Sequence, residues 1–301
     1  MGIAALRKIL PPAPFDVAQL RGRTVAVDAD NLIWSFVTAL AASPDMPKAP
    51  DGRPITHLLG LLSRLTLYAR WGARSVWVFD GIQPGLKEAT LIGRAERIEA
   101  ARVAGDNAQA AASVTEEDLE ECRALLTALG IPWIVAPGES DAQCAQLVQA
   151  GRAWAAVTQD WDIALFGAPR ALRNLTMSET RKPEVLELGV ALQAAGLTRA
   201  QLVDCAILIG TDYNPGIAGF GPVKAVKAIR RHGTAEAALE AMGASIRELD
   251  EVRGLYFSHP VDKGFVPAHK APDPAATRAF LEGRGIGAKR GQELIDVLAR
   301  S

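Results

Sequence analysis

Short apolar runs alternate with segments whose apolar residues recur at helical spacing over the first two thirds of the chain. A β-branched run at 23–28 predicts a strand, and residues 31–42 after it are compatible with a helix. Leucines at helical spacing predict a second helix over 56–71, and a second strand is predicted over 75–80. Strands that alternate with helices indicate an α/β fold with a mostly parallel sheet flanked by helices.

The middle of the chain continues the alternation. Residues 87–112 are rich in Ala, Glu and Arg and have few apolar anchors, which predicts a long, poorly buried helix or a helical arch. An amphipathic helix is expected over 115–129, and a strand over 133–136. Two further short strands, at 171–175 and 185–188, are expected at an edge of the sheet.

The chain changes character after residue 197. A capped helix is predicted to end at Ile209, and the glycine-rich stretch 210–221 permits a tight hairpin. Pro222 suits the first position of the next helix, whose free N–H groups could hold a phosphate. Three basic residues fall on one stripe of that helix: Lys224, Lys227 and Arg231. The stripe indicates a grip on a nucleic-acid backbone, with a solvated basic helix face as the alternative.

The composition is typical of a soluble globular protein. The 301 residues suffice for one large or two ordinary domains with a substantial core. Apolar residues make up 49% of the chain and charged residues 22%. Because the formal net charge is −1, a nucleic-acid partner must be argued from local basic stripes and not from the overall charge.

Cys122, Cys144 and Cys205 are widely separated and lie in apolar helical patterns. This spacing fits reduced packing residues better than a disulfide or zinc framework, so we expect a cytoplasmic protein. The first residues lack the apolar core of a signal peptide, and no apolar run is long enough to span a bilayer. We therefore expect no membrane partner.

Acidic residues recur where the predicted strands end. They are Asp28, Asp80, Glu139, Asp141, Asp160 and Asp162. Because ligands of open parallel sheets bind beyond the carboxyl ends of the strands, we expect these side chains to converge on one crevice. Their mutual repulsion calls for a cation, and hard oxygen ligands suit magnesium or manganese. Asp212, just ahead of the glycine hairpin, could supply a seventh carboxylate.

Each acidic motif also has an ordinary explanation. An isolated Asp-x-Asp more often flanks a surface turn, and Glu139 and Asp141 at a helix start could be capping and dipole partners. The apolar run that begins at Ala153 predicts a buried strand that delivers Asp160 and Asp162. Because residues two apart in an extended strand point the same way, we expect Asp160 and Asp162 on one face and Trp161 on the other. Repetition at equivalent strand ends favours the metal site. The histidines show no metal-protease spacing, and the chain has neither a Gly-x-Ser-x-Gly elbow nor a Walker-type phosphate loop.

Six motifs, taken in order, resemble those of the flap endonuclease family of structure-specific 5′ nucleases. They read Met1-Gly2-Ile3, Val-Ala-Val-Asp28-Ala, Val-Phe-Asp80-Gly, Ala-Pro-Gly-Glu139-Ser-Asp141-Ala, Thr-Gln-Asp160-Trp-Asp162 and Ile-Gly-Thr-Asp212-Tyr. The resemblance covers nearly the whole chain and implies a PIN-like nuclease core with a helix-two-turn-helix element. It also implies two-metal hydrolysis of DNA phosphodiesters at single-strand to duplex junctions, as a 5′ flap endonuclease and 5′–3′ exonuclease in DNA replication and repair.

The resemblance assigns roles to individual residues. The seven carboxylates become the metal-binding set for two Mg²⁺ ions, for which Mn²⁺ can substitute. Lys87 and Arg94 match basic arch residues that contact the scissile phosphate, and Trp34 matches an aromatic residue that stacks on a base. The other DNA contacts are implied for Gly2, Gly216, Ile217, Gly219, Gly221, Lys224 and Lys227, with K⁺ as a further ion at the hairpin.

The resemblance also divides the chain into a core, 1–196, with an arch near 82–114, a helix-two-turn-helix element, 197–245, and a segment that packs back on the core, 246–301. The implied partner is DNA with a 5′ flap or junction, bound by a monomer in the cytoplasm, or at the nucleoid of a prokaryote. The sequence lacks the glutamine-and-aromatic tail by which many relatives hold a sliding clamp, so clamp binding is not assumed. The arch is shorter than in eukaryotic members, and Asp30 stands where a small hydroxyl residue is usual.

Three alternatives stay open. A Holliday-junction or exonuclease relative keeps the whole site and differs in how it handles its substrate. A PIN-type ribonuclease shares the acidic crevice but does not need the basic hairpin. A non-catalytic DNA-binding module is the third, and the full set of carboxylates argues against it.

Overall fold

The computed structural model describes residues 4–40, 46–82, 85–87, 92, 96, 114–176 and 181–298. Within these ranges the strands form one seven-stranded sheet in the order β1-β7-β6-β5-β2-β3-β4. Their bounds are β1 Ala13–Pro14, β2 Thr24–Asp28, β3 Arg74–Phe79, β4 Trp133–Val135, β5 Ala155–Val157, β6 Arg170–Arg173 and β7 Glu184–Glu187. The strands from β6 to β4 run parallel, and β7 runs antiparallel to both of its neighbours, β6 and the edge strand β1. The predicted α/β class with a mostly parallel sheet is confirmed.

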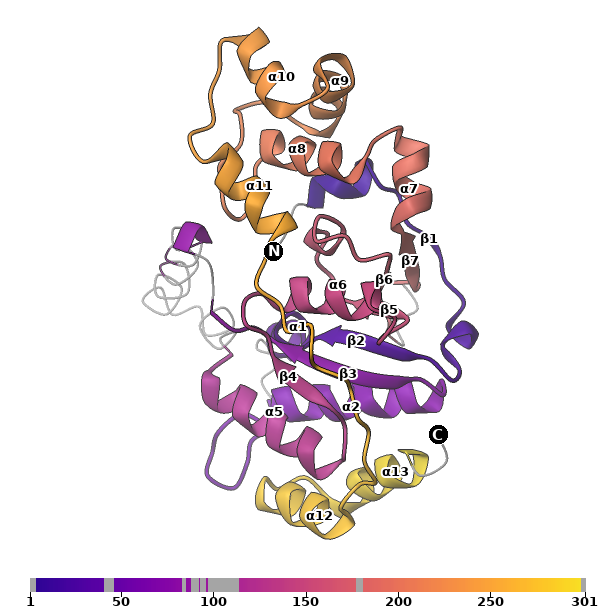
Figure 1. Cartoon of the computed structure of the whole chain (residues 1–301). Coiled ribbons are helices and arrows are strands. Elements are labelled where there is room, and N and C mark those ends of the chain that lie inside the picture. The colour runs from indigo at the N-terminus through magenta and orange to yellow at the C-terminus, as the bar shows by residue number, and fades with distance from the viewer. Residues whose placement is uncertain are drawn as a thin grey trace.

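Helices cover both faces of the sheet (Figure 1). One face packs against α1 (Ala29–Leu40), α2 (Thr56–Arg70) and α5 (Glu116–Ala128), and the other against α6 (Ser140–Gln149). Successive side chains of β2 point to opposite faces of the sheet. Val25 and Val27 pack in the first core, on the side of α1, α2 and α5, and Ala26 packs in the second core, on the side of α6. The sheet is therefore buried on both sides, as the uninterrupted apolar strands require.

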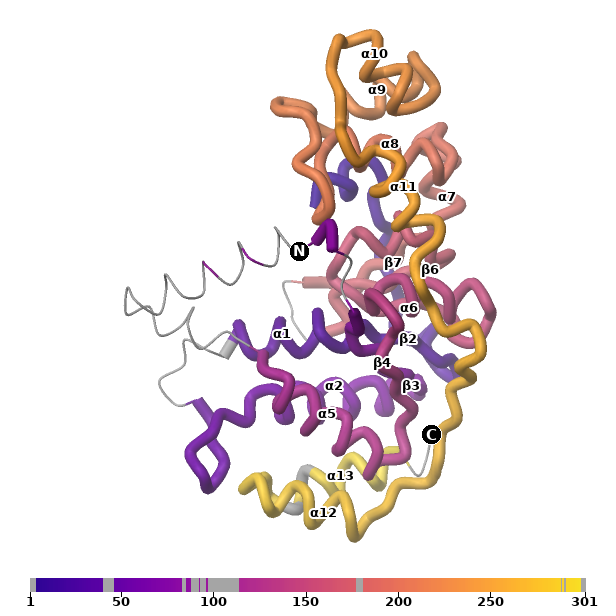
Figure 2. The backbone as a smooth tube through the Cα atoms, turned by 60° about the vertical axis from the view of Figure 1, so that its left-hand side comes forward, coloured from indigo at the N-terminus to yellow at the C-terminus, as the bar shows by residue number. Residues whose placement is uncertain are grey.

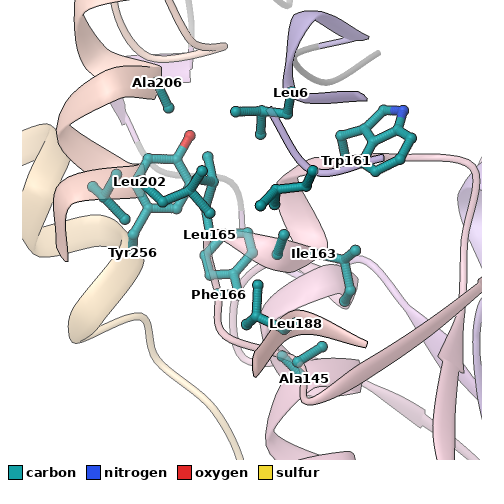
Figure 3. Packing of buried hydrophobic residues seen from close by; sticks show 14 of the residues in the cluster. Leu6, Ala145, Trp161, Ile163, Leu165, Phe166, Leu188, Leu202, Ala206 and Tyr256 are labelled. Atoms are coloured by element: carbon teal, nitrogen blue, oxygen red, sulfur yellow. The ribbon is translucent and has the colours of Figure 1, made fainter. Parts of the chain in front are cut away.

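A helical part stands at one end of the sheet (Figures 1 and 2). It contains α7 (Leu188–Ala195), α8 (Arg199–Ile209), α9 (Pro222–His232), α10 (Ala235–Met242) and α11 (Leu249–Phe257). Its apolar side chains continue the second core, and Figure 3 shows Leu202 and Tyr256 beside Leu165 and Phe166 of the sheet region. The helical part is thus fixed to the sheet by shared apolar packing.

The chain after α11 runs back along the whole molecule to the opposite end (Figure 2). This segment, residues 258–273, is called the strap. The main-chain N–H of Lys270 in the strap donates a hydrogen bond to the carbonyl oxygen of Gly130 in the α5–β4 loop. Two helices follow, α12 (Pro274–Gly283) and α13 (Ala288–Leu298), and they complete the first core beside α2 and α5.

Most elements lie where the sequence predicts them. The helices expected over 56–71 and 115–129 are α2 and α5, and Thr115 closes a capping box with Asp118. Cysteines in the described structure are free and buried, as expected. The elements that were not predicted include β1, which pairs with β7 and forms the edge, and the helices α7, α10 and α11. Most of 82–114 lies outside the described residues, so the arch stays a prediction.

The strand that was expected to carry Asp160 and Asp162 is shorter than predicted. β5 ends at Val157, and Asp162 opens a 3₁₀ turn, η4 (Asp162–Ala164). Trp161 has α-helical backbone angles, so the expected two-residue alternation across an extended strand is wrong there. The chain turns because polar groups replace the ladder: Asp162 N–H donates to Asp160 Oδ1 at 3.2 Å, and Asp160 N–H donates to Thr158 Oγ1 at 3.0 Å.

No single described helix is long and apolar enough to cross a membrane; α7 and α8 reach that length only as a pair bent by 74°.

Candidate active site

The predicted carboxylates lie at the carboxyl end of the parallel strands. Asp28 is the last residue of β2, Asp80 follows β3, and Asp160 follows β5. Glu139 precedes α6, and Asp141 lies in its first turn. Because β2 pairs with both β3 and β5, the three strand exits are neighbours. Asp28, Asp80 and Asp160 therefore lie at the same edge of the sheet.

Hydrogen bonds hold Asp28 and Asp80 in fixed positions. Ser140 donates from its hydroxyl to Asp28 Oδ1 at 2.9 Å and from its main-chain N–H to Asp80 Oδ1 at 2.8 Å. Thr158 Oγ1 donates to the second oxygen of Asp28 at 2.8 Å. Ser140 and Thr158 were not predicted as site residues, although both lie next to acidic motifs. The start of α6 thus orients two carboxylates at once.

The carboxylates repel one another strongly. Burial, then the charges of Asp80 and Asp30, raise the pKa of Asp28 to about 8. Burial and the neighbouring charges of Asp28, Asp160, Asp162 and Glu139 hold the pKa of Asp141 well above its ordinary value. Such shifts mark carboxyl groups that are difficult to ionise together unless a cation is present.

The donor set fits a divalent cation that prefers oxygen. Asp141 is buried, and its Oδ1 has no hydrogen-bond partner. Within the described ranges, no group of three or more His, Cys, Asp or Glu side chains is arranged to hold one ion by itself. Mg²⁺ commonly keeps several waters and binds through one or two carboxylates together with substrate phosphates. Asp28, Asp141 and their neighbours could hold such an ion in that way.

Glu139 is the N-cap residue of α6, but its side chain makes no capping hydrogen bond, so side-chain capping does not explain this residue. Its Oε1 instead accepts a hydrogen bond from Lys87 Nζ at 2.8 Å, and Lys87 ends a 3₁₀ turn, η3 (Gly85–Lys87). Two groups with separate predicted roles are therefore in direct contact.

The strap from the far end of the chain supports Glu139. His259 Nε2 accepts the main-chain N–H of Glu139 at 2.8 Å, and burial lowers the pKa of His259 below its ordinary value. The close approach requires glycine at 138, because a Cβ there would lie 2.3 Å from His259 Nε2. In the sequence His259 belongs to a proline-rich stretch, and no local pattern there predicts a role for it.

Asp212 reaches the same region from the helical part. It follows the end of α8 and is half-buried. Its charge acts on Lys87 together with those of Glu139 and Asp80. The next residue, Tyr213, is buried, and burial and then Glu139 raise the pKa of its hydroxyl. The helical part therefore closes one side of the crevice.

Arg173 is a cation of this site that was not predicted from the sequence. It ends β6, its guanidinium lies 4.3 Å from the centre of the Trp161 ring, and its Nε and Nη1 are buried without hydrogen-bond partners. Burial lowers the pKa of Arg173 to about 10, while Asp160 is the largest influence in the opposite direction. The only signal in the sequence was an arginine in the middle of the edge strand expected at 171–175.

The glycine hairpin has the tight geometry that the sequence predicts. Gly216 and Gly219 have positive φ angles of 68° and 73°, and a Cβ on Gly216 would lie 2.4 Å from Gly210 N. Ile217 N–H donates to the carbonyl oxygen of Leu208 at 3.0 Å. Gly221 precedes α9, which begins with Pro222, as predicted. Lys224 Nζ donates to the carbonyl oxygen of Gly219 at 2.9 Å, so this lysine also braces the hairpin.

A groove of about 600 Å³ lies beside α9 and away from the carboxylates. Its apolar lining residues include Ile9, Val223 and Val226. Its basic lining residues are Lys8, Lys227, Arg230 and Arg231. Positive charge is therefore concentrated on this face, although the whole chain is almost neutral.

Trp34 is the aromatic residue that the sequence predicts to stack on a base. Trp34 is 38% exposed on α1, one turn after Asp30, and is therefore accessible near the start of the crevice. Gly2 and Arg94 lie outside the described residues, so their roles stay predictions.

Comparison with known proteins covers nearly all of the chain. Residues 1–101 match the XPG N-terminal domain, and residues 130–212 match the XPG I-region. Flap endonuclease 1 from Methanocella arvoryzae is 37% identical over 298 residues, which is 91% of this chain and 88% of that protein. The structure of flap endonuclease-1 from Methanococcus jannaschii has a TM-score of 0.81 and 28% identity, covering 98% of both chains. The catalytic core of Rad2 in complex with DNA substrate has a TM-score of 0.78 and 26% identity, covering 99% of this chain and 100% of that one.

Proposed function

This chain belongs to the flap endonuclease family, and from that premise we propose that it hydrolyses DNA phosphodiesters at single-strand to duplex junctions. The predicted family and its PIN-like class are confirmed, and the chain is a nuclease. We propose 5′ flap cleavage and 5′–3′ exonuclease activity in replication and repair. The observation that carries the proposal is the set of carboxylates at the β2, β3 and β5 exits and at the start of α6, where Asp141 Oδ1 has no hydrogen-bond partner.

Members of this family use divalent metal ions, and the finer assignment to two Mg²⁺ ions is part of the proposal. The residues that would hold them are Asp28, Asp80, Glu139, Asp141, Asp160, Asp162 and Asp212. When bound, such ions activate water and stabilise the leaving oxygen of an in-line displacement. Ser140 and Thr158 keep Asp28 oriented, and Lys87 supplies a positive charge at the edge of the crevice.

Lys87 can stabilise charge on the reacting phosphate only after it leaves Glu139. Its ammonium is held by one carboxylate oxygen, so a phosphate oxygen that enters the crevice could take that place. Donors aimed at the oxygens on which charge grows contribute most in the transition state. Lys87 is therefore assigned to catalysis, and Arg94 is assigned the same role on the resemblance alone.

The duplex is proposed to lie along the hairpin and α9. Lys224 and Lys227 offer positive charge, and main-chain carbonyl oxygens such as those of the hairpin at 216–221 are a ligand type that K⁺ accepts. Phosphate contacts of this kind fix the position of the duplex without reading its sequence. Trp34 would stack on a base near the crevice. We propose the core, 1–196, for chemistry and 197–245 for duplex binding.

A cleavage panel tests the function. Labelled 5′ flap, nicked duplex, four-way junction and single-stranded RNA are incubated with the full chain, with and without magnesium. We expect magnesium-dependent cleavage at the base of the flap and weaker 5′–3′ degradation at the nick. Preferred cleavage of the four-way junction would favour a Holliday-junction resolvase, and preferred cleavage of RNA would favour a PIN-type ribonuclease. DNA binding without any cleavage would leave only the non-catalytic module.

A further inference from the structure

Asp30 adds a carboxylate beside the proposed metal site. It lies in the first turn of α1, two residues after Asp28, and its Oδ2 accepts the main-chain N–H of Asp80 at 2.8 Å. The proposed metal set does not include it. Its contact is with the main chain of a proposed ligand, and 50 residues of sequence separate the two partners.

The N–H of Asp80 needs a partner because the sheet ends there. The last paired residues of β3 are Val78, opposite Asp28, and Phe79, opposite Val135. Asp80 is the next residue, so its N–H lies beyond both ladders, and a buried N–H without a partner is strongly unfavourable. Asp30 supplies the acceptor that a further strand residue would have supplied.

This contact closes a ring of hydrogen bonds. Asp80 Oδ1 accepts the N–H of Ser140, and the Ser140 hydroxyl donates to Asp28 Oδ1. The main chain from Asp28 to Asp30 completes the circuit. The ring joins the ends of β2 and β3 to the starts of α1 and α6. Asp28 and Asp80, two proposed metal-binding carboxylates, are therefore members of the same ring.

The contact has an electrostatic cost. Burial and the charge of Asp80 raise the pKa of Asp30 to about 7, and Asp30 in turn contributes to the raised pKa of Asp28. A neutral amide oxygen would accept the same N–H without adding charge to the crevice. The hydrogen bond to the Asp80 N–H therefore needs an acceptor oxygen at this position and does not need its negative charge.

We propose that Asp30 is a positioning residue that fixes Asp80 for metal binding through the main-chain hydrogen bond. The inference rests on the proposed function, because it takes Asp80 as a metal-binding carboxylate. Groups that hold metal ligands in place typically change metal affinity by about 10–100-fold when they are removed.

Calorimetric titration of the full chain with Ca²⁺, without DNA, measures binding separately from cleavage. We expect Asp30→Ala to weaken Ca²⁺ binding by about 10–100-fold. Asp30→Asn keeps an oxygen that can accept the Asp80 N–H, so it should stay within about threefold of the parent. The matched control is Asp273→Ala, which removes another carboxylate that accepts main-chain N–H groups at a helix start, on α12, and should leave Ca²⁺ binding unchanged.

The outcomes separate the inference from the proposed function. A parent chain that binds no Ca²⁺ would remove the proposed metal site and the inference with it. If the parent binds and Asp30→Ala binds equally well, only the positioning role fails. Equal weakening by Asp30→Asn and Asp30→Ala would assign the effect to charge and would also overturn it. If Asp30→Ala does not fold, Asp30→Ser is titrated in its place. The serine hydroxyl lies one bond nearer the main chain than the lost carboxylate oxygen, so the contact with the Asp80 N–H should again be lost and Ca²⁺ binding should weaken.

Discussion

The ammonium nitrogen of Lys87 lies 2.8 Å from Oε1 of Glu139, and both side chains are largely buried. Burial lowers the pKa of Lys87, but the charges of Glu139, Asp80 and Asp212 outweigh it, and the pKa lies above its ordinary value. Lys87 therefore stays protonated near neutral pH. A divalent cation at Glu139 would compete with this ion pair, so metal binding and the release of Lys87 toward a phosphate are expected to be linked.

Lys87→Ala should reduce chemistry much more than DNA binding. We expect the single-turnover rate to fall by about 100-fold, the scale for losing one electrostatic stabiliser, because positive charge here acts mainly in the transition state. The dissociation constant for a 5′ flap substrate should change much less. Single-turnover cleavage at saturating enzyme measures the rate, with the exposed Lys182→Ala as the control. Cleavage of the flap by Lys87→Ala at the parental rate would return Lys87 to a purely structural role.

Asp160→Asn and Asp162→Asn should each abolish turnover while the protein stays folded. Each change removes one negative charge from a repelling cluster, so the melting temperature in chelator should not fall and could rise. Calorimetry in EDTA together with the flap assay checks both parts. A variant that loses activity only because it is unfolded would not support the assignment.

The metal-free protein should lose stability as the pH rises from about 4 to about 8. The pKa of Asp28 is about 8 in the folded chain against an ordinary value of 3.8, so the folded state binds more protons than the unfolded state in this window. Stability that depends on the protonated form is present at low pH and is lost as the pH rises through the folded pKa. Melting temperatures in EDTA across this range measure the effect.

Asp28→Asn is the matched variant for that pH series, since its neutral amide does not titrate. It should show a flatter dependence than the parent. Added Mg²⁺ should raise the parent's melting temperature more at pH 8 than at pH 6, because metal binding must displace protons at the lower pH. Parallel curves for parent and variant would contradict the assignment to Asp28.

Replacing both Lys224 and Lys227 with Ala should weaken binding to all duplex-containing substrates alike. We expect the salt slope of log K to fall by about two, one for each lost phosphate contact, without a change in sequence preference. Lys224→Ala should also loosen the hairpin, because Lys224 holds the carbonyl of Gly219. Fluorescence anisotropy over a salt series measures the slope, and the exposed Lys289→Ala on α13 is the control. An unchanged slope would identify the stripe as a solvated helix face.

Local patterns in the sequence determined much of the fold and of the acidic set. β-branched runs specify the central strands, Thr115 and Thr198 mark helix starts, and Pro222 marks the start of α9. Asp28 and Asp80 could be predicted because parallel strands place their carboxyl ends on one edge. These inferences succeed because spacing of 2 or 3.6 residues is fixed by the backbone itself.

The contacts within the site were decided only by the tertiary structure. Asp28 meets Thr158 across 130 residues of sequence, and Glu139 meets His259 across 120. The turn at Asp160 was not predictable because side-chain hydrogen bonds replace the strand ladder after Val157. Arg173 and Asp30 had no predicted role because an isolated charge in a sequence has no partner until folding supplies one. Periodicity determines which face a residue occupies, but packing between distant segments determines which groups touch and how strongly their charges interact.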